Sequence, residues 1–394
     1  MDSVDTVVVG GGTVGGWTAV LLAEAGCSVV LVEADTLGSG ASSRAAGMVR
    51  AQGGTEAAIR LGIYSRQFYS EQCSRFPLDS GFVAQGYLMP CFTADEVRAA
   101  HERIALQRSL GLDVDWLAPV EVDAQATGLA PGCTLGASYA AGDGYLEAPR
   151  NVLAYSAALV ALGVDIREHT SFTGLLVDGD EVVGVETSAG RITTGSVVLT
   201  GGPELATVGR LAGGTVHAGG TRHQVVVTAP VPGAAELPMV FDVASGIYWR
   251  PGEHGGLLWG MSNPAEQPGP ARDFDWDYYG LMRARVAELL PIAANVPLRR
   301  AWAATIDYTP DHLPILGPLL RDGAPVHGTV VASAGGHGMM WGPGVAQAAA
   351  DIVRSGHTEV VDATQLGLDR FDAQGRSKLA ADPIALPFPQ SVLS

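Results

Sequence analysis

A glycine-rich turn placed between an apolar strand and a helix constrains this chain more than any other feature. The motif is Gly10-x-Gly12-x-x-Gly15, and it follows the β-branched run Thr6–Val9. In a strand–turn–helix unit the first glycine permits the tight turn, the second lets backbone N–H groups approach a pyrophosphate, and the third lets the helix pack close to the sheet. Glu33 ends the next apolar run, about 20 residues on, where a carboxylate can accept hydrogen bonds from ribose hydroxyls. The pattern predicts a dinucleotide site; the alternative is a glycine-rich turn beside a solvated Glu33.

The composition is that of a folded, acidic protein with a sizeable core. Of the 394 residues 47% are hydrophobic and 16% are charged, which disfavours disorder, collagen and coiled coil. The formal net charge is -17 and the Lys and Arg residues form no cluster, so neither nucleic acid nor an anionic membrane surface is expected as a partner. The four cysteines show no metal-ligand spacing, and no metal is expected. Glycines interrupt the apolar stretch near the N-terminus, unlike a signal sequence or a membrane span, which predicts a cytoplasmic location.

The order of the predicted strands and helices indicates an α/β fold with two domains. A strand at 28–32 completes a βαβ unit with the first strand and a helix at 14–25. Between residues 222 and 260, short strands separated by Pro and Gly predict an antiparallel sheet. Further helices are predicted at 94–110, 153–162 and 278–290. Near the C-terminus a strand at 329–332 precedes a helix that is expected to begin after Gly342-Pro343, so the nucleotide-binding domain returns at the far end of the chain.

Three segments spread over nearly the whole chain carry a family resemblance. The first is the glycine motif through Glu33, and the second is the run from Gly40 to Arg50. The third joins Trp302 through Thr309-Pro310-Asp311 to Gly336-His337-Gly338. Together they resemble the D-amino-acid oxidase superfamily of flavoproteins, in the branch that contains glycine oxidase, sarcosine oxidase and dimethylglycine dehydrogenase.

The resemblance implies a Rossmann-like FAD-binding domain of the glutathione-reductase type and an α+β substrate domain with a mainly antiparallel sheet. The FAD-binding domain would comprise residues 1–80, 146–210 and 311–394, the last including a C-terminal tail, and the substrate domain would comprise 81–145 and 211–310. FAD is expected to be bound non-covalently. The Cys that sarcosine oxidase uses for flavin attachment corresponds to Ala304, and the His of dimethylglycine dehydrogenase corresponds to Arg44.

Cofactor contacts are expected from five places. They are the glycine turn, the loop after the second strand, the loop before the strand near residue 172, the glycines near residue 201, and the stretch before the last helix. By family resemblance the N-terminus of that helix points at the C2 carbonyl side of the flavin, where its N–H dipoles stabilise the charge of the reduced ring. An ordinary loop is the alternative for this stretch. The expected contacts are Gly10, Gly12, Thr13, Val14, Gly15, Glu33, Ala34, Ser42, Ser43, Arg44, Ala46, Gly47, Met48, Phe172, Gly201, Gly338, Met339 and Met340.

Three residues are candidates for the substrate side of the site. Arg50 matches an active-site arginine of sarcosine oxidase and could pair with a carboxylate through two hydrogen bonds. Tyr248 matches a family tyrosine that faces the substrate, and His337 lies in the Gly-His-Gly motif. Each has a structural alternative: a surface residue or ion pair for Arg50, a core or interface aromatic for Tyr248, and a packed, hydrogen-bonded histidine for His337.

Other positions depart from the family pattern. Ile306 stands where amino-acid oxidases carry a carboxylate-binding Arg, and Met340 stands where monomeric sarcosine oxidases carry a Lys. Leu258 lies near the position of their oxygen-activating Lys. The loss of that Lys favours a slow oxidase or a dehydrogenase.

The implied activity is oxidation of the C–N bond of an amino acid or secondary amine to an imine, by hydride transfer to flavin N5 and reoxidation by O2 or another acceptor. One alternative is a larger hydrophobic or carboxylate-masked amine in a biosynthetic pathway, which the apolar Ile306 and Met340 favour. Another is a flavoprotein subunit of a heteromeric dehydrogenase, because residues 302–308 also resemble the β subunits of heterotetrameric sarcosine oxidase. The sequence therefore leaves open a homo-oligomer or a partner subunit. An NAD-dependent dehydrogenase is disfavoured, since the flavin-facing segments would then have no explanation.

Overall fold

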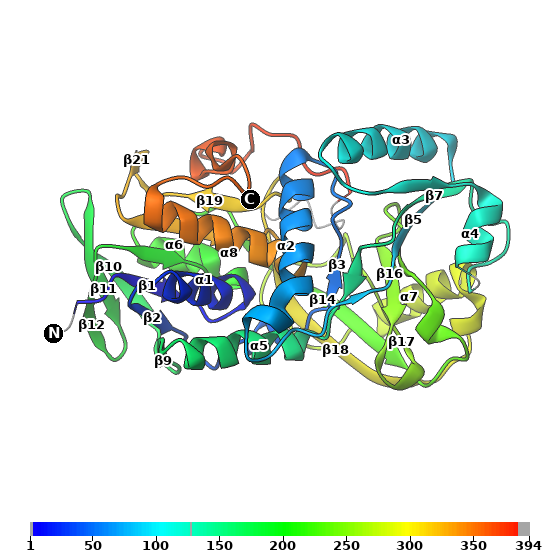
Figure 1. Cartoon of the computed structure of the whole chain (residues 1–394), viewed down its shortest axis with the longest axis horizontal. Helices are drawn as coiled ribbons and strands as arrows, with labels where there is room; N and C mark the ends of the chain where they lie inside the picture. Colours follow the sequence, from blue (N-terminus) through cyan, green and yellow to red (C-terminus); the bar gives the residue numbers. More distant parts are fainter. Residues whose placement is uncertain (1–2, 127, 385–394) are drawn as a thin grey trace.

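A six-stranded, mainly parallel sheet forms the core of one half of the chain (Figure 1). The computed structural model describes residues 3–126 and 128–384. In spatial order the strands are β19 (Ile315–Gly317), β22 (Thr329–Ser333), β13 (Val197–Leu199), β1 (Thr6–Val9), β2 (Val29–Val32) and β9 (Asp165–Arg167). All neighbours run parallel except β19, which is antiparallel to β22. The sheet joins the start, the middle and the end of the sequence, as the position of its last strand predicts.

The two faces of this sheet bury alternate residues of β1. Val8 packs in a cluster with helices α1 (Thr13–Glu24), α5 (Ala148–Ala161) and α8 (Gly338–Ser355). Val7 and Val9 face the other way, toward a small antiparallel sheet of β10 (Phe172–Asp178), β11 (Glu181–Thr187) and β12 (Gly190–Thr193). Burial on both faces explains the uninterrupted β-branched run, since no side of the strand meets water. Helices α1 and α8 lie side by side in Figure 1, with buried alanines of α8 against α1.

An eight-stranded, mainly antiparallel sheet forms the other half. Its order is β18 (Leu298–Tyr308), β14 (Gly219–Thr228), β17 (Leu257–Met261), β16 (Ile247–Pro251), β15 (Met239–Phe241), β5 (Tyr87–Cys91), β7 (Gly136–Ala140) and β6 (Asp115–Leu117). Only β15 and β5 pair in parallel among these neighbours. The two sheets confirm the predicted α/β fold with a Rossmann-like part and an antiparallel part.

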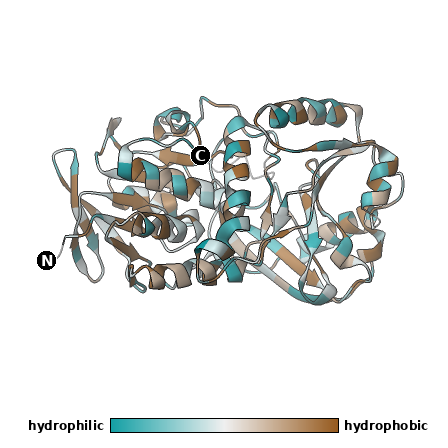
Figure 2. Cartoon of the chain, viewed as in Figure 1, coloured by the Kyte–Doolittle hydropathy of each residue, from teal (hydrophilic) through white to brown (hydrophobic). Residues whose placement is uncertain are grey.

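The remaining elements connect and cover the two sheets. Helix α2 (Glu56–Arg75) runs between the two halves in Figure 1 and packs on α8. Figure 2 shows many hydrophilic residues on the outer helix α3 and mainly hydrophobic residues in the strands of the core. The other elements are α3 (Ala94–Ser109), α4 (Pro119–Gln125), α6 (Leu205–Leu211), α7 (Trp276–Leu289), β3 (Met48–Val49), β4 (Val83–Ala84), β8 (Gly144–Tyr145), β20 (Leu320–Arg321) and β21 (Ala324–Pro325). Among the described residues, none of the helices combines the length and the apolar character that a membrane crossing requires.

The predicted start of the last helix is wrong. Helix α8 begins at Gly338, ahead of Gly342-Pro343, and encloses Pro343. Its first turn is already closed by the hydrogen bond from Trp341 N–H to the His337 carbonyl at 2.8 Å. Burial of Met339 and Trp341 holds this turn, so tertiary packing overrides the preference of proline for the first helical position. The consequence is that the helix begins directly after Gly335-Gly336-His337 and not after Pro343.

Candidate functional site

One cavity of about 480 Å³ lies where the two large sheets meet. The carboxyl ends of β1, β2 and β13 contribute to its wall, and so do residues of β14, β16 and β18. Each predicted cofactor or substrate residue lines this cavity except Ser43. Ser43 lines a smaller cavity of about 180 Å³, which shares Arg44 and Ala45 with the first. The structure thus brings the predicted residues from distant parts of the sequence around a single space.

The glycine turn has the geometry that its motif predicts. Gly10 has a φ of 99°, in the region that favours glycine, and a Cβ on it would lie 2.5 Å from Thr200 Oγ1. A Cβ on Gly15 would lie 1.9 Å from the Gly10 carbonyl oxygen, so only glycine allows α1 to pack this close to the turn. Helix α1 starts after Gly12 without a side-chain cap and without an acidic residue in its first turn. Its positive end therefore faces the cavity unopposed, which suits a pyrophosphate.

Two side chains shape the nucleotide end of the cavity beside this turn. Ser42 Oγ accepts a hydrogen bond from the Thr13 N–H at 2.9 Å, which fixes the loop after β2 against the start of α1. Glu33 Oε2 accepts from the Gly11 N–H at 2.7 Å, and its Oε1 accepts from the Asp35 N–H at 2.9 Å. These bonds hold the carboxylate at the end of β2 while each oxygen keeps a lone pair for a ribose hydroxyl. Glu33 is therefore partly buried and held by two backbone hydrogen bonds.

The loop from Arg44 to Met48 is held by its backbone. The Trp302 indole N–H donates to the Arg44 carbonyl at 2.8 Å, and the buried Arg250 guanidinium donates to the Ala46 carbonyl at 2.6 Å. Gly47 has a φ of 76°, and a Cβ there would lie 1.9 Å from the Leu146 carbonyl oxygen. The loop lines the cavity and is held in place by these contacts.

The start of α8 presents a second helix N-terminus to the cavity. His337 occupies the N-cap position without a side-chain cap, and the first turn holds no acidic residue. The ring of His337 contacts that of Trp341 in a tilted arrangement with centroids 4.1 Å apart, and its Nδ1 lies 3.2 Å from the Gly335 carbonyl. Its Nε2 has no hydrogen-bond partner within the described part of the chain. Burial lowers the pKa of His337 to about 3, and the nearby Arg50 adds to this effect, so the ring is neutral at physiological pH.

Tyr248 and His223 form a hydrogen-bonded pair at the opposite end from the glycine turn. The Tyr248 hydroxyl lies 2.6 Å from His223 Nε2, and the two rings stack at 5.6 Å. Part of the His223 ring faces the cavity, but the surrounding protein removes it from bulk water and lowers its pKa to about 4. Burial raises the pKa of Tyr248, so both groups are neutral. The pair offers a donor and an acceptor to a bound molecule without adding charge.

Arg50 is a buried cation in the cavity wall, only 3% exposed. Its Nη1 donates to the Gln52 carbonyl at 2.7 Å, and its Nη2 donates to the Ile384 carbonyl at 2.9 Å. The guanidinium also lies over the Phe241 ring at 5.3 Å from its centroid. Its burial makes the surface alternative wrong. Within residues 3–126 and 128–384 no carboxylate forms a direct ion pair with it, but its charge interacts with that of the buried Asp382. A fixed guanidinium of this kind suits an anionic ligand group.

His223, Asp307, Glu204 and Arg272 are among the polar residues of the wall that sequence reasoning missed. Asp307 accepts a hydrogen bond from Ser333 Oγ at 2.8 Å, and burial raises its pKa. The sequence position of Asp307 could have indicated it, because this residue directly follows Ile306, which aligns with a substrate-binding residue of the family. Ile306, Met340 and Ala304 also line the cavity, whereas Leu258 lines the smaller one. Within the described residues no group of His, Cys, Asp and Glu is arranged to hold a metal ion.

The neutral His223 predicts acid destabilisation of the apoprotein. In the unfolded chain a histidine takes up its proton near pH 6.5, while the folded His223 does so near pH 4. The unfolded state therefore binds more protons between these values, and stability is full above about pH 6.5 and falls as the pH drops toward 4. The loss from this residue is on the order of 3 kcal/mol. Thermal unfolding at pH 7.5 and pH 4.5 should show a smaller loss for His223→Asn than for the wild type; equal losses would contradict the assignment.

Comparison with known proteins places the chain in a family. The family model described as FAD dependent oxidoreductase matches residues 5–352. The 4-methylaminobutanoate oxidase (formaldehyde-forming) of Paenarthrobacter nicotinovorans is 29% identical over 392 residues, covering 95% of this chain but only 46% of that oxidase. Glycine oxidase of Geobacillus kaustophilus is 29% identical over 323 residues, covering 79% of this chain and 84% of the oxidase. The crystal structure of L-proline dehydrogenase from P. horikoshii has a TM-score of 0.87 and 25% identity, covering 94% of this chain and 98% of that one. The family match extends over most of the chain and confirms the resemblance: the protein belongs to the family of FAD dependent oxidoreductases.

Proposed function

We propose that the protein binds FAD non-covalently and oxidises the C–N bond of an amino acid or a secondary amine to an imine. The observation that carries this proposal is the continuity of one cavity from the glycine turn and Glu33 to Tyr248, His223 and Arg50. The nucleotide end has the donors and the carboxylate that a dinucleotide requires. The wall of the other end includes the apolar side chains of Phe241 and Ile306, one buried cation and one neutral polar pair.

The chain's own groups fit the cofactor at three points. The N-terminus of α1 would bind the diphosphate, Glu33 would accept hydrogen bonds from a ribose, and the N-terminus of α8 would lie at the flavin. When bound, FAD supplies the hydride acceptor. Non-covalent binding is supported by Ala304 and Arg44 at the two positions where relatives attach the flavin, and by the absence of any described cysteine from the cavity wall.

The substrate end supports an amine with a carboxylate. Arg50 would bind the carboxylate, and the Tyr248–His223 pair would orient the amine. Because His223 and His337 have pKa values of about 4 and about 3, neither is charged at neutral pH. Both imidazoles are also too weakly basic to take a proton from the substrate amine. The residues thus bind and orient the substrate, and they exclude water, without a dedicated acid or base. The named substrates of the relatives, glycine, 4-methylaminobutanoate and L-proline, span the primary and secondary amines to test first.

A larger, carboxylate-masked amine is the second candidate. It is favoured by the apolar side chains of Ile306 and Met340 in the cavity wall, where the family resemblance leads one to expect charged residues. Turnover of an amine ester in preference to the free acid would select this candidate.

The test is the visible spectrum of the purified protein. We expect a flavin spectrum that moves to the supernatant on acid precipitation, and bleaching by at least one amine of the panel in the absence of oxygen. Readmission of O2 then separates an oxidase from a dehydrogenase by the rate at which colour returns. A protein that takes up no FAD, or whose flavin stays with the precipitate, contradicts the cofactor assignment; a flavin that no amine bleaches contradicts the substrate class.

A further inference from the structure

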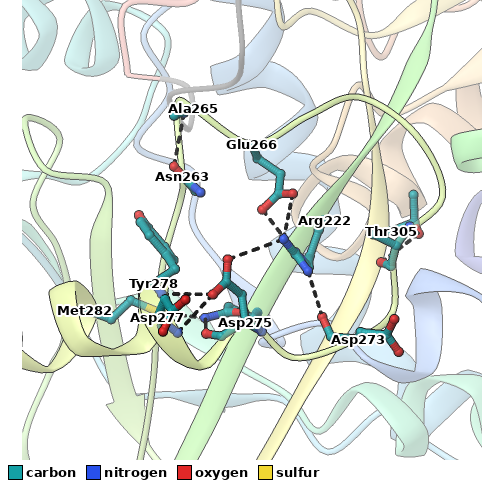
Figure 3. A network of polar contacts seen from close by, with 12 residues as sticks. Arg222, Asn263, Ala265, Glu266, Asp273, Asp275, Asp277, Tyr278, Met282 and Thr305 are labelled. Carbon is teal, nitrogen blue, oxygen red and sulfur yellow. Dashed lines mark hydrogen bonds and ion pairs between the residues drawn. The ribbon is translucent and has the colours of Figure 1, made fainter.

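The loop between β17 and α7 brings a cation, Arg272, to the wall of the cavity. Hydrogen bonds hold the backbone on both sides of this residue. The Ala271 N–H donates to Thr305 Oγ1 at 3.1 Å, and the same hydroxyl donates to the Ala271 carbonyl at 3.1 Å. On the other side, Arg222 Nη1 donates to the Asp273 carbonyl at 3.2 Å (Figure 3). The position of the Arg272 backbone is therefore fixed relative to β14 and β18.

A network of charged residues in turn fixes Arg222 (Figure 3). Its Nε and Nη2 donate to the two carboxylate oxygens of Glu266 at 3.0 and 2.9 Å, a bidentate arrangement, and Nη2 also lies 3.4 Å from Asp275 Oδ2. Asp275 caps α7 by accepting from the Asp277 and Tyr278 N–H groups. Two carboxylates, a helix start and a strand thus act together to hold one loop.

The Arg272 side chain itself is exposed and, in the part of the chain that the structure describes, has no hydrogen-bond or ion-pair partner. The chain orders the backbone beneath this guanidinium and leaves the charged group unpaired in a ligand cavity. Such an arrangement is expected when the partner of the cation is an anionic ligand.

The contacts around the loop place Arg272 at the nucleotide end of the cavity, so an anion that it binds would lie there. A Cβ on Gly220 would lie 2.8 Å from Thr305 Cγ2 and 3.0 Å from Pro203 Cβ, so the anchor Thr305 sits beside the turn that follows β13. That turn begins with Gly201, and β13 is the direct neighbour of β1 and its glycine turn. Arg272 is therefore anchored near the ends of the two strands where a diphosphate would lie.

A second cation shares this region. Burial lowers the pKa of Arg44, and the charge of Arg272 lowers it further, while Asp35 acts in the opposite direction. The guanidinium groups of Arg44 and Arg272, which both line the cavity, therefore repel each other. Arg272 also interacts electrostatically with Glu204, next to Pro203, whereas Arg50 and His337 interact at the substrate end. A doubly charged anion between Arg44 and Arg272 would remove their repulsion.

We propose that Arg272 binds the diphosphate of FAD, opposite the N-terminus of α1. The inference rests on the proposed FAD site and adds a residue that the glycine motif does not contain. A helix N-terminus supplies only about half a positive charge, and the protein as a whole carries -17, so an exposed guanidinium on a hydrogen-bonded loop completes the neutralisation of the cofactor. Cofactor binding would then tie the loop before α7 to the turn before α1.

The experiment is FAD binding to the apoprotein by calorimetry at low and high salt, for the wild type, Arg272→Gln, Arg272→Lys and Arg299→Gln. Arg299 is an exposed residue of β18 outside both cavities, so its substitution changes the net charge equally. We expect Arg272→Gln to raise the FAD Kd roughly tenfold at low salt and less at high salt. ADP, which keeps the diphosphate but lacks the flavin, should lose the same factor. Arg272→Lys should lose less, and Arg299→Gln should match the wild type.

Each outcome bears on a different claim. A wild-type Kd for FAD in Arg272→Gln overturns the inference while leaving the FAD site intact, and so does an equal loss in Arg299→Gln, which would indicate a general effect of charge. An unchanged FAD Kd with a raised KM for the amine would assign Arg272 to the substrate. If the wild-type apoprotein takes up no FAD at all, the proposed function fails first. Equal thermal unfolding of the apoproteins shows that the variants are folded.

Discussion

Replacing Gly15 by alanine is expected to weaken FAD binding on the order of 100-fold and to destabilise the apoprotein by about 1–3 kcal/mol. The added Cβ would lie 1.9 Å from the Gly10 carbonyl oxygen and 2.9 Å from Thr200 Oγ1. A backbone carbonyl cannot yield as a flexible side chain would, so α1 must move away from the turn. That movement displaces the N–H groups that face the diphosphate. The flavin absorbance retained per protein and the FAD Kd measure the loss.

Gly280→Ala is the matched control. Gly280 also lies inside a helix, α7, but a Cβ there would meet no atom within 4 Å. Alanine is favoured over glycine in a helix by about 0.5–1 kcal/mol, so this variant should be slightly more stable and should bind FAD normally. The two substitutions share their effect on helix propensity and differ in the close approach. Normal flavin content in Gly15→Ala would show that the turn has room that the structure does not indicate.

The nucleotide end of the site could be predicted because its chemistry is local in sequence. The turn, the helix start and Glu33 lie within one βαβ unit, and each glycine of the motif is required there for a steric reason. The return of the last strands to the sheet that contains β1, where β22 pairs with β13, was expected from the apolar runs and from the family resemblance. The start of α8 was misplaced because a proline preference is weaker than the burial of the turn before it.

The substrate end could not be predicted in full because strand pairing assembles it. His223 lies opposite Ala304, and Thr221 lies opposite Ile306, in the pairing of β14 with β18. This register places the imidazole beside Ala304, the position aligned with the flavin-attaching Cys of sarcosine oxidase, and nothing local to residue 223 indicates it. The position of Arg272 in the cavity wall depends on an even longer chain of contacts, which runs from Asp275 and Glu266 through Arg222 to the loop. A single sequence shows none of these pairings.

Tyr248→Phe is expected to lower kcat/KM for the amine on the order of 10- to 100-fold while the FAD Kd stays unchanged. The lost hydroxyl lies 2.6 Å from His223 Nε2, so its removal takes away a polar group of the site and leaves the imidazole nitrogen without its partner. Because both groups are neutral, the loss should be similar from pH 6 to pH 9. Steady-state kinetics over this range test the expectation. Tyr139→Phe removes a hydroxyl that bonds Gln125 outside the cavity and should leave kcat/KM unchanged.

A double-mutant cycle with His223→Asn decides whether the pair acts as a unit. If Tyr248 and His223 position the amine together, either single substitution already removes most of their contribution to kcat/KM. The double variant should then be only slightly slower than either single variant. Multiplying losses would mean that the two residues contact the substrate independently. Wild-type kcat/KM in Tyr248→Phe would reduce the tyrosine to an aromatic wall of the cavity, and His223 would then orient the amine without its hydroxyl partner.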